Sequence, residues 1–159
     1  MFARDFDGAI RRAEEAVEID DAFALGHWVL GSTLQCAGRA EAAVSAYRRA
    51  AELTRGSPLM QSQVACGLAD SGDVAGARRI LANLTRQEPG RPAGPPYFVA
   101  MAQALLGRAE EAFESLRVAY RERAVHLVFL AVDPRWDSLR DDRRFRELVL
   151  RIGLRPPPR

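Results

Sequence analysis

The sequence lacks lysine altogether, so all 23 of its basic side chains are arginines. The 21 acidic residues are interspersed with these arginines, and the net charge is only +2. Such mixing is typical of helix surfaces covered by salt bridges, and it disfavours a nucleic-acid footprint. The use of arginine alone is what codon bias in a GC-rich genome produces, so it indicates no function.

Long apolar runs are also missing. No stretch approaches the length that a membrane-spanning helix needs. The longest candidate, residues 124–132, is too short and contains His126. The first residues form no apolar core of a signal peptide. We therefore expect a protein without a membrane partner, located in the cytoplasm.

Chemically reactive residues are few. There are two cysteines and two histidines, and their spacing fits neither a CxxC motif nor a zinc site. The sequence contains no G-x-S-x-G, H-E-x-x-H or G-x-x-x-x-G-K motif. We expect no catalytic residue, no metal and no cofactor, and we interpret Cys36 and Cys66 as free thiols.

What the sequence does contain is a repeat. Gly38, Gly72 and Gly107 each interrupt a helical pattern, at intervals of 34 and then 35 residues. The same spacing of small and apolar residues surrounds each glycine. A fixed period of this size predicts stacked supersecondary units, so the functional question moves from catalysis to the surface that the stack builds.

Apolar periodicity and breaker residues divide the chain into helices. We predict helices over residues 5–19, 22–37, 40–54, 58–71, 74–86, from Pro95 or Pro96 to about 106, and 109–122. Asp21, Ser57 and Asp73 are the predicted N-caps. After residue 123 the repeat stops, and we expect a short apolar helix over 124–132, a brief turn with Trp136 and Leu139, and a last amphipathic helix over 141–152.

The repeated residues resemble the tetratricopeptide repeat, a helix–turn–helix unit of 34 residues. Its pattern W-x2-L-G-x2-Y…A-x3-F-x2-A is matched by His27-x2-Leu30-Gly31-x2-Leu34…Ala43-x3-Tyr47-x2-Ala50. The second copy reads Gln61-x2-Val64-Ala65-x2-Leu68…Ala77-x3-Leu81-x2-Leu84. The departures are at the first aromatic position, where His27, Gln61 and Pro96 stand, and at Arg55 in place of the closing proline. The resemblance implies an all-α superhelix of helix hairpins.

This resemblance sets the predicted domain organisation. Repeats occupy residues 1–123, as a half repeat over 5–21 and full repeats over 24–57, 58–91 and 93–123. Residues 124–153 are expected to form capping helices, and residues 154–159 a disordered tail. Because residues 5–21 match the second helix of a repeat, we expect this chain to be part of a larger protein.

The segment from Leu127 to Leu148 carries a second resemblance. It is similar to the C-terminal end of tetratricopeptide regions in bacterial multidomain signalling proteins, where such regions follow adenylate cyclase, serine/threonine kinase or winged-helix regulator domains. The resemblance implies that this segment covers the apolar edge of the last repeat, because terminal units need a closed outer face.

In stacked helix pairs the first helices line the concave side. Helical phase predicts a largely apolar groove, with Trp28 and Tyr97 as aromatic anchors. Such a groove suits an amphipathic helix or an extended apolar segment of a protein or peptide partner, or of another domain of the same chain. The predicted lining residues are Leu25, Trp28, Ser32, Gln35, Leu59, Ser62, Cys66, Asp70, Tyr97, Met101 and Leu105.

The sequence leaves three alternatives open. The C-terminal cap can fold over the groove and fill it. The unpaired first helix can leave Ile10, Ala13 and Val17 exposed, and a second copy would then cover them in a homodimer. The arginines between Arg135 and Arg155 can contact nucleic acid, although neighbouring acids largely offset their charge.

Overall fold

The computed structural model describes residues 5–86 and 94–155, which form helices and short turns without any strand. The fold is therefore all-α, as predicted. The elements in chain order are α1 (Phe6–Ile19), α2 (Ala24–Cys36), α3 (Ala40–Leu53), α4 (Pro58–Asp70), α5 (Val74–Thr85), α6 (Pro96–Leu105), α7 (Ala109–Arg121), η1 (Val125–Phe129), η2 (Pro134–Leu139) and α8 (Arg143–Arg151).

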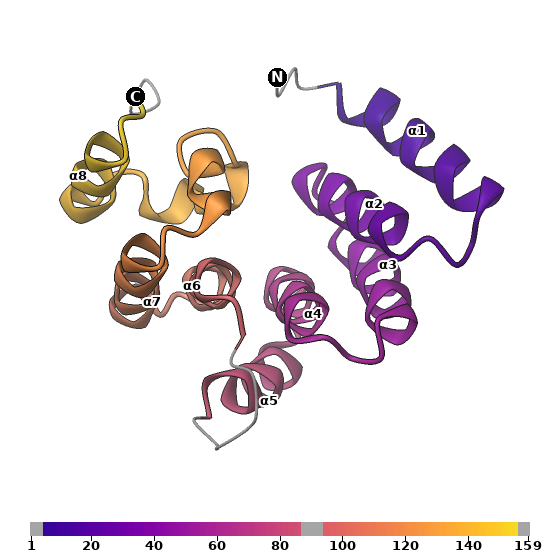
Figure 1. Ribbon diagram of the computed structural model, residues 1–159, viewed down its shortest axis with the longest axis horizontal. Coiled ribbons are helices and arrows are strands. Elements are labelled where there is room, and N and C mark those ends of the chain that lie inside the picture. The colour runs from indigo at the N-terminus through magenta and orange to yellow at the C-terminus, as the bar shows by residue number, and fades with distance from the viewer. Residues whose placement is uncertain (1–4, 87–93, 156–159) are drawn as a thin grey trace.

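The helices pair as hairpins, α2 with α3, α4 with α5 and α6 with α7. Gly38, Gly72 and Gly107 form the tight turns within these pairs, and each has the positive φ that is typical of a left-handed helix C-terminus. The first helices α2, α4 and α6 also pack against one another in sequence. Figure 1 shows the resulting arc, with α1 at one end and α8 at the other.

Two of the three predicted helix caps are confirmed. Ser57 and Asp73 accept hydrogen bonds from the backbone N–H groups of Met60 and Gly76. The prediction for Asp21 is wrong, because α2 begins later, with Phe23 at its N-cap and no capping side chain. The Asp21 carboxylate pairs instead with Arg49.

Small residues allow the helices to approach closely. A Cβ at Gly31 of α2 would lie 2.6 Å from the ring of Tyr47 in α3. A Cβ at Gly67 of α4 would lie 3.0 Å from Val44 and 3.1 Å from Tyr47. Tyr47 is therefore clamped between its own hairpin partner and the next hairpin, which explains why this large residue is fully buried.

The apolar helix expected over residues 124–132 is the shorter 3-10 helix η1, and the brief turn expected at Trp136 and Leu139 is the 3-10 helix η2. In a 3-10 helix, residues three apart lie on one face. Leu127 and Leu130 share the inward face and are buried, whereas Val125 and Val128 are exposed. A sequence that is apolar throughout thus presents two different faces, one to the core and one to solvent.

The elements η1, η2 and α8 are here called the cap. Trp136 of η2 is fully buried and donates its indole N–H to the Tyr97 hydroxyl at 2.9 Å. Phe145 and Val149 of α8 complete this core. Leu154, which was assigned to a disordered tail, is half-buried and donates its N–H to the Val149 carbonyl. Arg155 of the predicted tail is exposed, and residues 156–159 lie outside the described residues.

Candidate functional site

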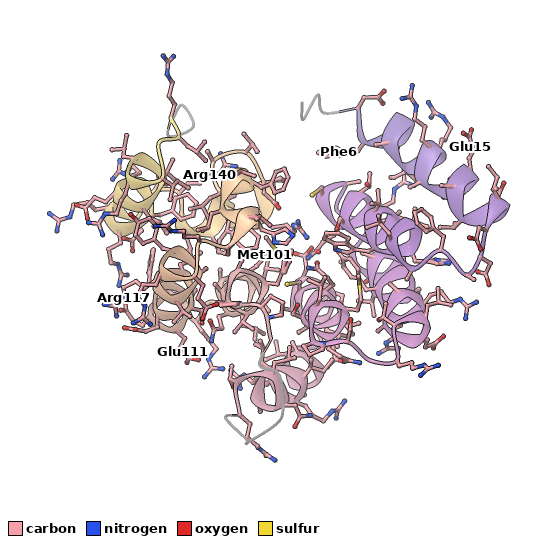
Figure 2. All side chains as sticks on the ribbon, viewed as in Figure 1. Phe6, Glu15, Met101, Glu111, Arg117 and Arg140 are labelled. Carbon is pink, nitrogen blue, oxygen red and sulfur yellow. The ribbon has the colours of Figure 1, made fainter. Side chains whose placement is uncertain are left out.

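The concave side of the arc contains a cleft of about 260 Å³ between the first two helices and the cap. Most of its lining is apolar or aromatic. Figure 2 shows Phe6 on the inner side of α1 and Met101 near the middle of the arc, while Glu111 and Arg117 lie on the outer surface. The cleft is lined by Asp5, Phe6 and Ala9 from the α1 side, Trp28, Ser32, Thr33 and Cys36 from α2, Tyr97 and Phe98 from α6, and His126, Phe129, Asp133 and Arg135 from the cap.

An aromatic cluster forms the floor of the cleft. The Trp28 ring stands edge-on to Phe98, with centroids 6.2 Å apart. His126 lies against Phe98 at 4.6 Å and stacks on Tyr97 at 5.8 Å. These pairs connect the first hairpin to the cap through α6. The predicted anchor Trp28 is half-buried and lines the cleft.

A buried ion pair lies beside this cluster. Arg135 and Asp133 are joined at 2.6 Å, and both side chains are almost fully enclosed. Arg135 also donates to Gln35 Oε1 of α2 and to the Tyr47 hydroxyl of α3, each at 3.4 Å. The cap therefore fills part of the groove by extending one arginine across it to the first hairpin.

Three titratable groups around the cleft are held in neutral or paired states. Burial alone would lower the pKa of Arg135, but Tyr47 and the Asp133 carboxylate hold it well above its ordinary value. Burial lowers the pKa of His126, so its neutral form dominates at pH 7. Burial also raises the pKa of Cys36 to about 11, which keeps this thiol protonated and weakly nucleophilic.

Several predicted groove residues are not on an open surface. Tyr97 lines the cleft as predicted, although it is 2% exposed. By contrast, Gln35, Ser62, Cys66 and Met101 are buried beneath the cap or between hairpins. The assumption that every inward-facing position is accessible is wrong for them, because α2, α4 and α6 pack closely and η2 covers α6.

The remaining predicted groove residues divide between the cleft and its surroundings. Trp28 and Ser32 line the cleft, and Leu25 is exposed on the same helix. Leu59 is half-buried between hairpins. Asp70 and Leu105 lie with Arg135 in a second, more open depression of about 330 Å³.

The residues predicted for self-association are not available to a second copy. Ile10 and Ala13 are buried, and Val17 is half-buried. They face inward because α1 packs against α2, and the Val17 side chain lies close to Gly26 of that helix. The exposed small residue of α1 is Ala9, which lies on another part of the helix.

Acidic partners neutralise much of the arginine-rich C-terminal segment. Arg140 pairs with Asp137, Arg143 with Glu147, and Arg144 with both Asp142 and Glu110. Arg135 is enclosed with Asp133. Such pairing offsets the charge of these four arginines, which disfavours them as phosphate contacts.

Sequence reasoning missed the contribution of Arg135, Asp133 and Phe129 to the cleft, because they come from outside the repeat. It also missed Ala9, for which a signal existed. Ala9 occupies the same repeat position as Ala43, Ala77 and Ala112, so the sequence alone marks it as a position where another helix can pack.

Comparison of the chain with protein-family models, with curated proteins and with solved structures yields no match. Within residues 5–86 and 94–155, no cluster of histidine, cysteine, aspartate and glutamate could hold a metal ion. In the same ranges no helix is both long and apolar enough to cross a bilayer. The structure thus defines an all-α chain of packed helix hairpins with an apolar concave cleft.

Proposed function

We propose that this chain is a non-catalytic protein-interaction domain of the tetratricopeptide type, which binds an apolar or amphipathic polypeptide segment in the cleft beside Trp28. The observation that carries the proposal is the apolar lining of this cleft. By the resemblance of residues 127–148, the domain would serve a larger bacterial signalling or regulatory protein in the cytoplasm.

Exposed apolar side chains extend the cleft at both rims. Leu25 and Val29 are exposed on α2, which contributes Trp28 and Ser32 to the cleft, and Phe129 is an exposed residue of the cleft lining itself. Large apolar residues gathered around a concave site are typical of protein-interaction surfaces. The cleft itself is slightly smaller than the range of about 300–1,000 Å³ that is usual for small-molecule pockets. It suits a large side chain that projects from a partner segment lying across the rims.

The chemistry of the lining supports binding rather than catalysis. The Cys36 thiol is protonated, and the Asp133 carboxylate is engaged by Arg135. His126 has only aromatic neighbours among its ring contacts. Activation of a nucleophile requires a base within hydrogen-bond reach, and this arrangement does not provide such a pair.

Site-specific photo-crosslinking tests the proposal. A benzophenone side chain is placed at Val29 on the rim, or at Val74 on α5 as a matched control that is similarly exposed at 40% compared with 46%. In cells that express the chain, we expect discrete protein adducts from position 29 and none of the same mass from position 74. Addition of Trp28→Arg should remove the adducts while circular dichroism stays helical. Adducts that survive Trp28→Arg, or that appear equally from both positions, would contradict the proposal.

A further inference from the structure

The second depression, of about 330 Å³, adjoins the cleft in which the partner segment is proposed to bind. Cys36 of α2 and Arg135 of η2 line both of them. The cleft and the depression are therefore neighbouring parts of one surface, and they meet at these two residues. A polypeptide segment that is anchored in the cleft can continue along this surface into the depression.

The end of each first helix contributes to the depression. Cys36, Asp70 and Leu105 are the last residues of α2, α4 and α6, and all three line it. The first helices run in the same direction, because each hairpin repeats the one before, so their C-terminal ends meet here. A helix C-terminus carries a partial negative charge, and a cation is stabilised beside its last turn. Three such ends together favour a positively charged group.

The side chains of the depression add to this preference. Asp70 is exposed and has no ion-pair partner among the described residues. Asp137 also lines the depression, and its side chain stays 66% exposed in its ion pair with Arg140. The basic residue of the lining, Arg135, is enclosed with Asp133, so its charge is already offset. The depression is thus acidic, although the net charge of the chain is +2.

We propose that the partner segment carries a basic side chain, arginine or lysine, which enters this depression while an apolar side chain of the same segment occupies the cleft. The inference rests on the proposed function, and it names the chemistry of the partner. Charge complementarity carries it, because the depression offers a cation the unpaired Asp70 carboxylate and three helix C-termini. The partner is thereby distinguished from a segment that is apolar throughout.

Short peptides with an acetylated N-terminus and an amidated C-terminus provide the probe. Each contains one tryptophan for the cleft and one arginine for the depression, separated by one, two, three or four glycines. This series covers separations of about 7–17 Å along an extended chain, at about 3.3 Å per residue. In the matched peptides citrulline replaces arginine, which keeps the shape of the side chain and removes its charge.

Titration of the peptides into the full chain is followed by calorimetry at low salt. We expect at least one arginine peptide to bind with a Kd at least about fivefold lower than that of its citrulline match, which is the size of an exposed ion pair near a helix end. Added salt should reduce this difference, because it screens exposed charges. Citrulline peptides that bind as tightly as their arginine matches throughout the series would overturn the inference, and so would a series in which no peptide binds.

Two protein variants locate the basic side chain. Asp70→Asn removes the unpaired carboxylate from the depression. Glu15→Gln is the matched control, since Glu15 is also exposed but lies on α1, which does not line the depression. Asp70→Asn should abolish the advantage of arginine over citrulline, whereas Glu15→Gln should leave it unchanged. An equal loss in both variants would indicate an effect of net charge alone and would overturn the inference.

Photo-crosslinking from position 29 separates this inference from the proposed function. Asp70→Arg places a positive charge in the depression and should reduce the discrete adducts at least about fivefold, because it repels the basic side chain of the partner. Glu15→Arg, the matched control, should not reduce them. Adducts that persist with Asp70→Arg would overturn the inference. If Trp28→Arg still removes those adducts, the proposed function stands and only the basic character of the partner is wrong.

Discussion

The two ends of the hairpin stack are built from similar helices but end differently. At the C-terminal end, η1, η2 and α8 cover α6 and α7, and Trp136 and Phe145 are fully buried there. At the N-terminal end, α1 packs mainly against α2, with Ala9, Leu25 and Val29 exposed. Figure 1 shows these ends facing each other across the opening of the arc.

The difference indicates a division of roles. A closed end contributes stability, because its apolar residues are already removed from water. An open end leaves apolar surface that can bind something else. If the two ends have these roles, substitutions at the closed end should mainly change the free energy of unfolding, whereas substitutions at the open end should mainly change binding.

The two tryptophans give the largest expected contrast. Trp136→Ala should lower the free energy of unfolding by about 3–5 kcal/mol, because it removes a fully buried ring and its hydrogen bond to Tyr97. Trp28→Ala should cost less than half as much, since this ring is only half-buried. Urea denaturation of both variants measures the contrast, and equal losses would show that the first hairpin is no less essential to stability than the cap.

The buried ion pair gives the next effect. Asp133→Ala leaves the enclosed Arg135 charge without its carboxylate and should cost about 3 kcal/mol. The double variant Asp133→Leu with Arg135→Met should recover most of that loss, because neither charge remains buried. Glu147→Ala is the control, since it removes an exposed ion pair with Arg143 and should change stability by less than about 1 kcal/mol. A double variant as unstable as Asp133→Ala would contradict this explanation.

Gln63 permits a comparison at a single repeat position. Its amide is fully buried and has no hydrogen-bond partner among the described residues. Gln63→Val should therefore raise the free energy of unfolding by about 1 kcal/mol, since an enclosed amide without a partner is costly. The reverse exchange at the open end, Val29→Gln, should change stability little because residue 29 is exposed. Thermal denaturation of both variants measures the two changes in the free energy of unfolding. Changes of the same sign and size would contradict the comparison.

His126 gives the smallest effect, and a pH-dependent one. Burial holds the pKa of His126 below its ordinary value of 6.5 in the folded chain, so the unfolded chain binds this proton more readily. The free energy of unfolding should therefore fall as the pH drops through 6.5 towards the folded-state pKa. His126→Phe should remove this component, and an NMR titration of the ring checks the pKa itself. A ring pKa above 6.5 would reverse the predicted slope.

Much of the fold was predictable because local chemistry determines it. Gly38, Gly72 and Gly107 end first helices with positive φ, and Ser57 and Asp73 begin helices with side-chain caps. These signals depend on a few neighbouring residues. The prediction for Asp21 failed because two equivalent acids, Asp20 and Asp21, precede α2. The role of Asp21 is decided by its ion pair with Arg49, which lies on another helix.

The candidate site was less predictable because its walls come from distant parts of the chain. Helical phase correctly placed Trp28 and Ser32 at the cleft. It could not show that η2 would cover Tyr97 and Met101, because that contact depends on how sharply the arc curves. The 3-10 geometry of η1 escaped prediction for a related reason, since its core-facing residues are selected by packing against α6 and α7 rather than by local propensity.

Arg135 has a consequence for how the chain folds. In a simple repeat array each unit contacts only its neighbours, so the array can unravel from its ends in steps. Arg135 donates hydrogen bonds to Gln35, which lies 100 positions away in the sequence, and to Tyr47, which lies 88 positions away. A contact of such long range forms late and couples the first hairpin to the last segment. We therefore expect the array to unfold in one cooperative transition, and we expect Arg135→Met to make the urea dependence of that transition less steep.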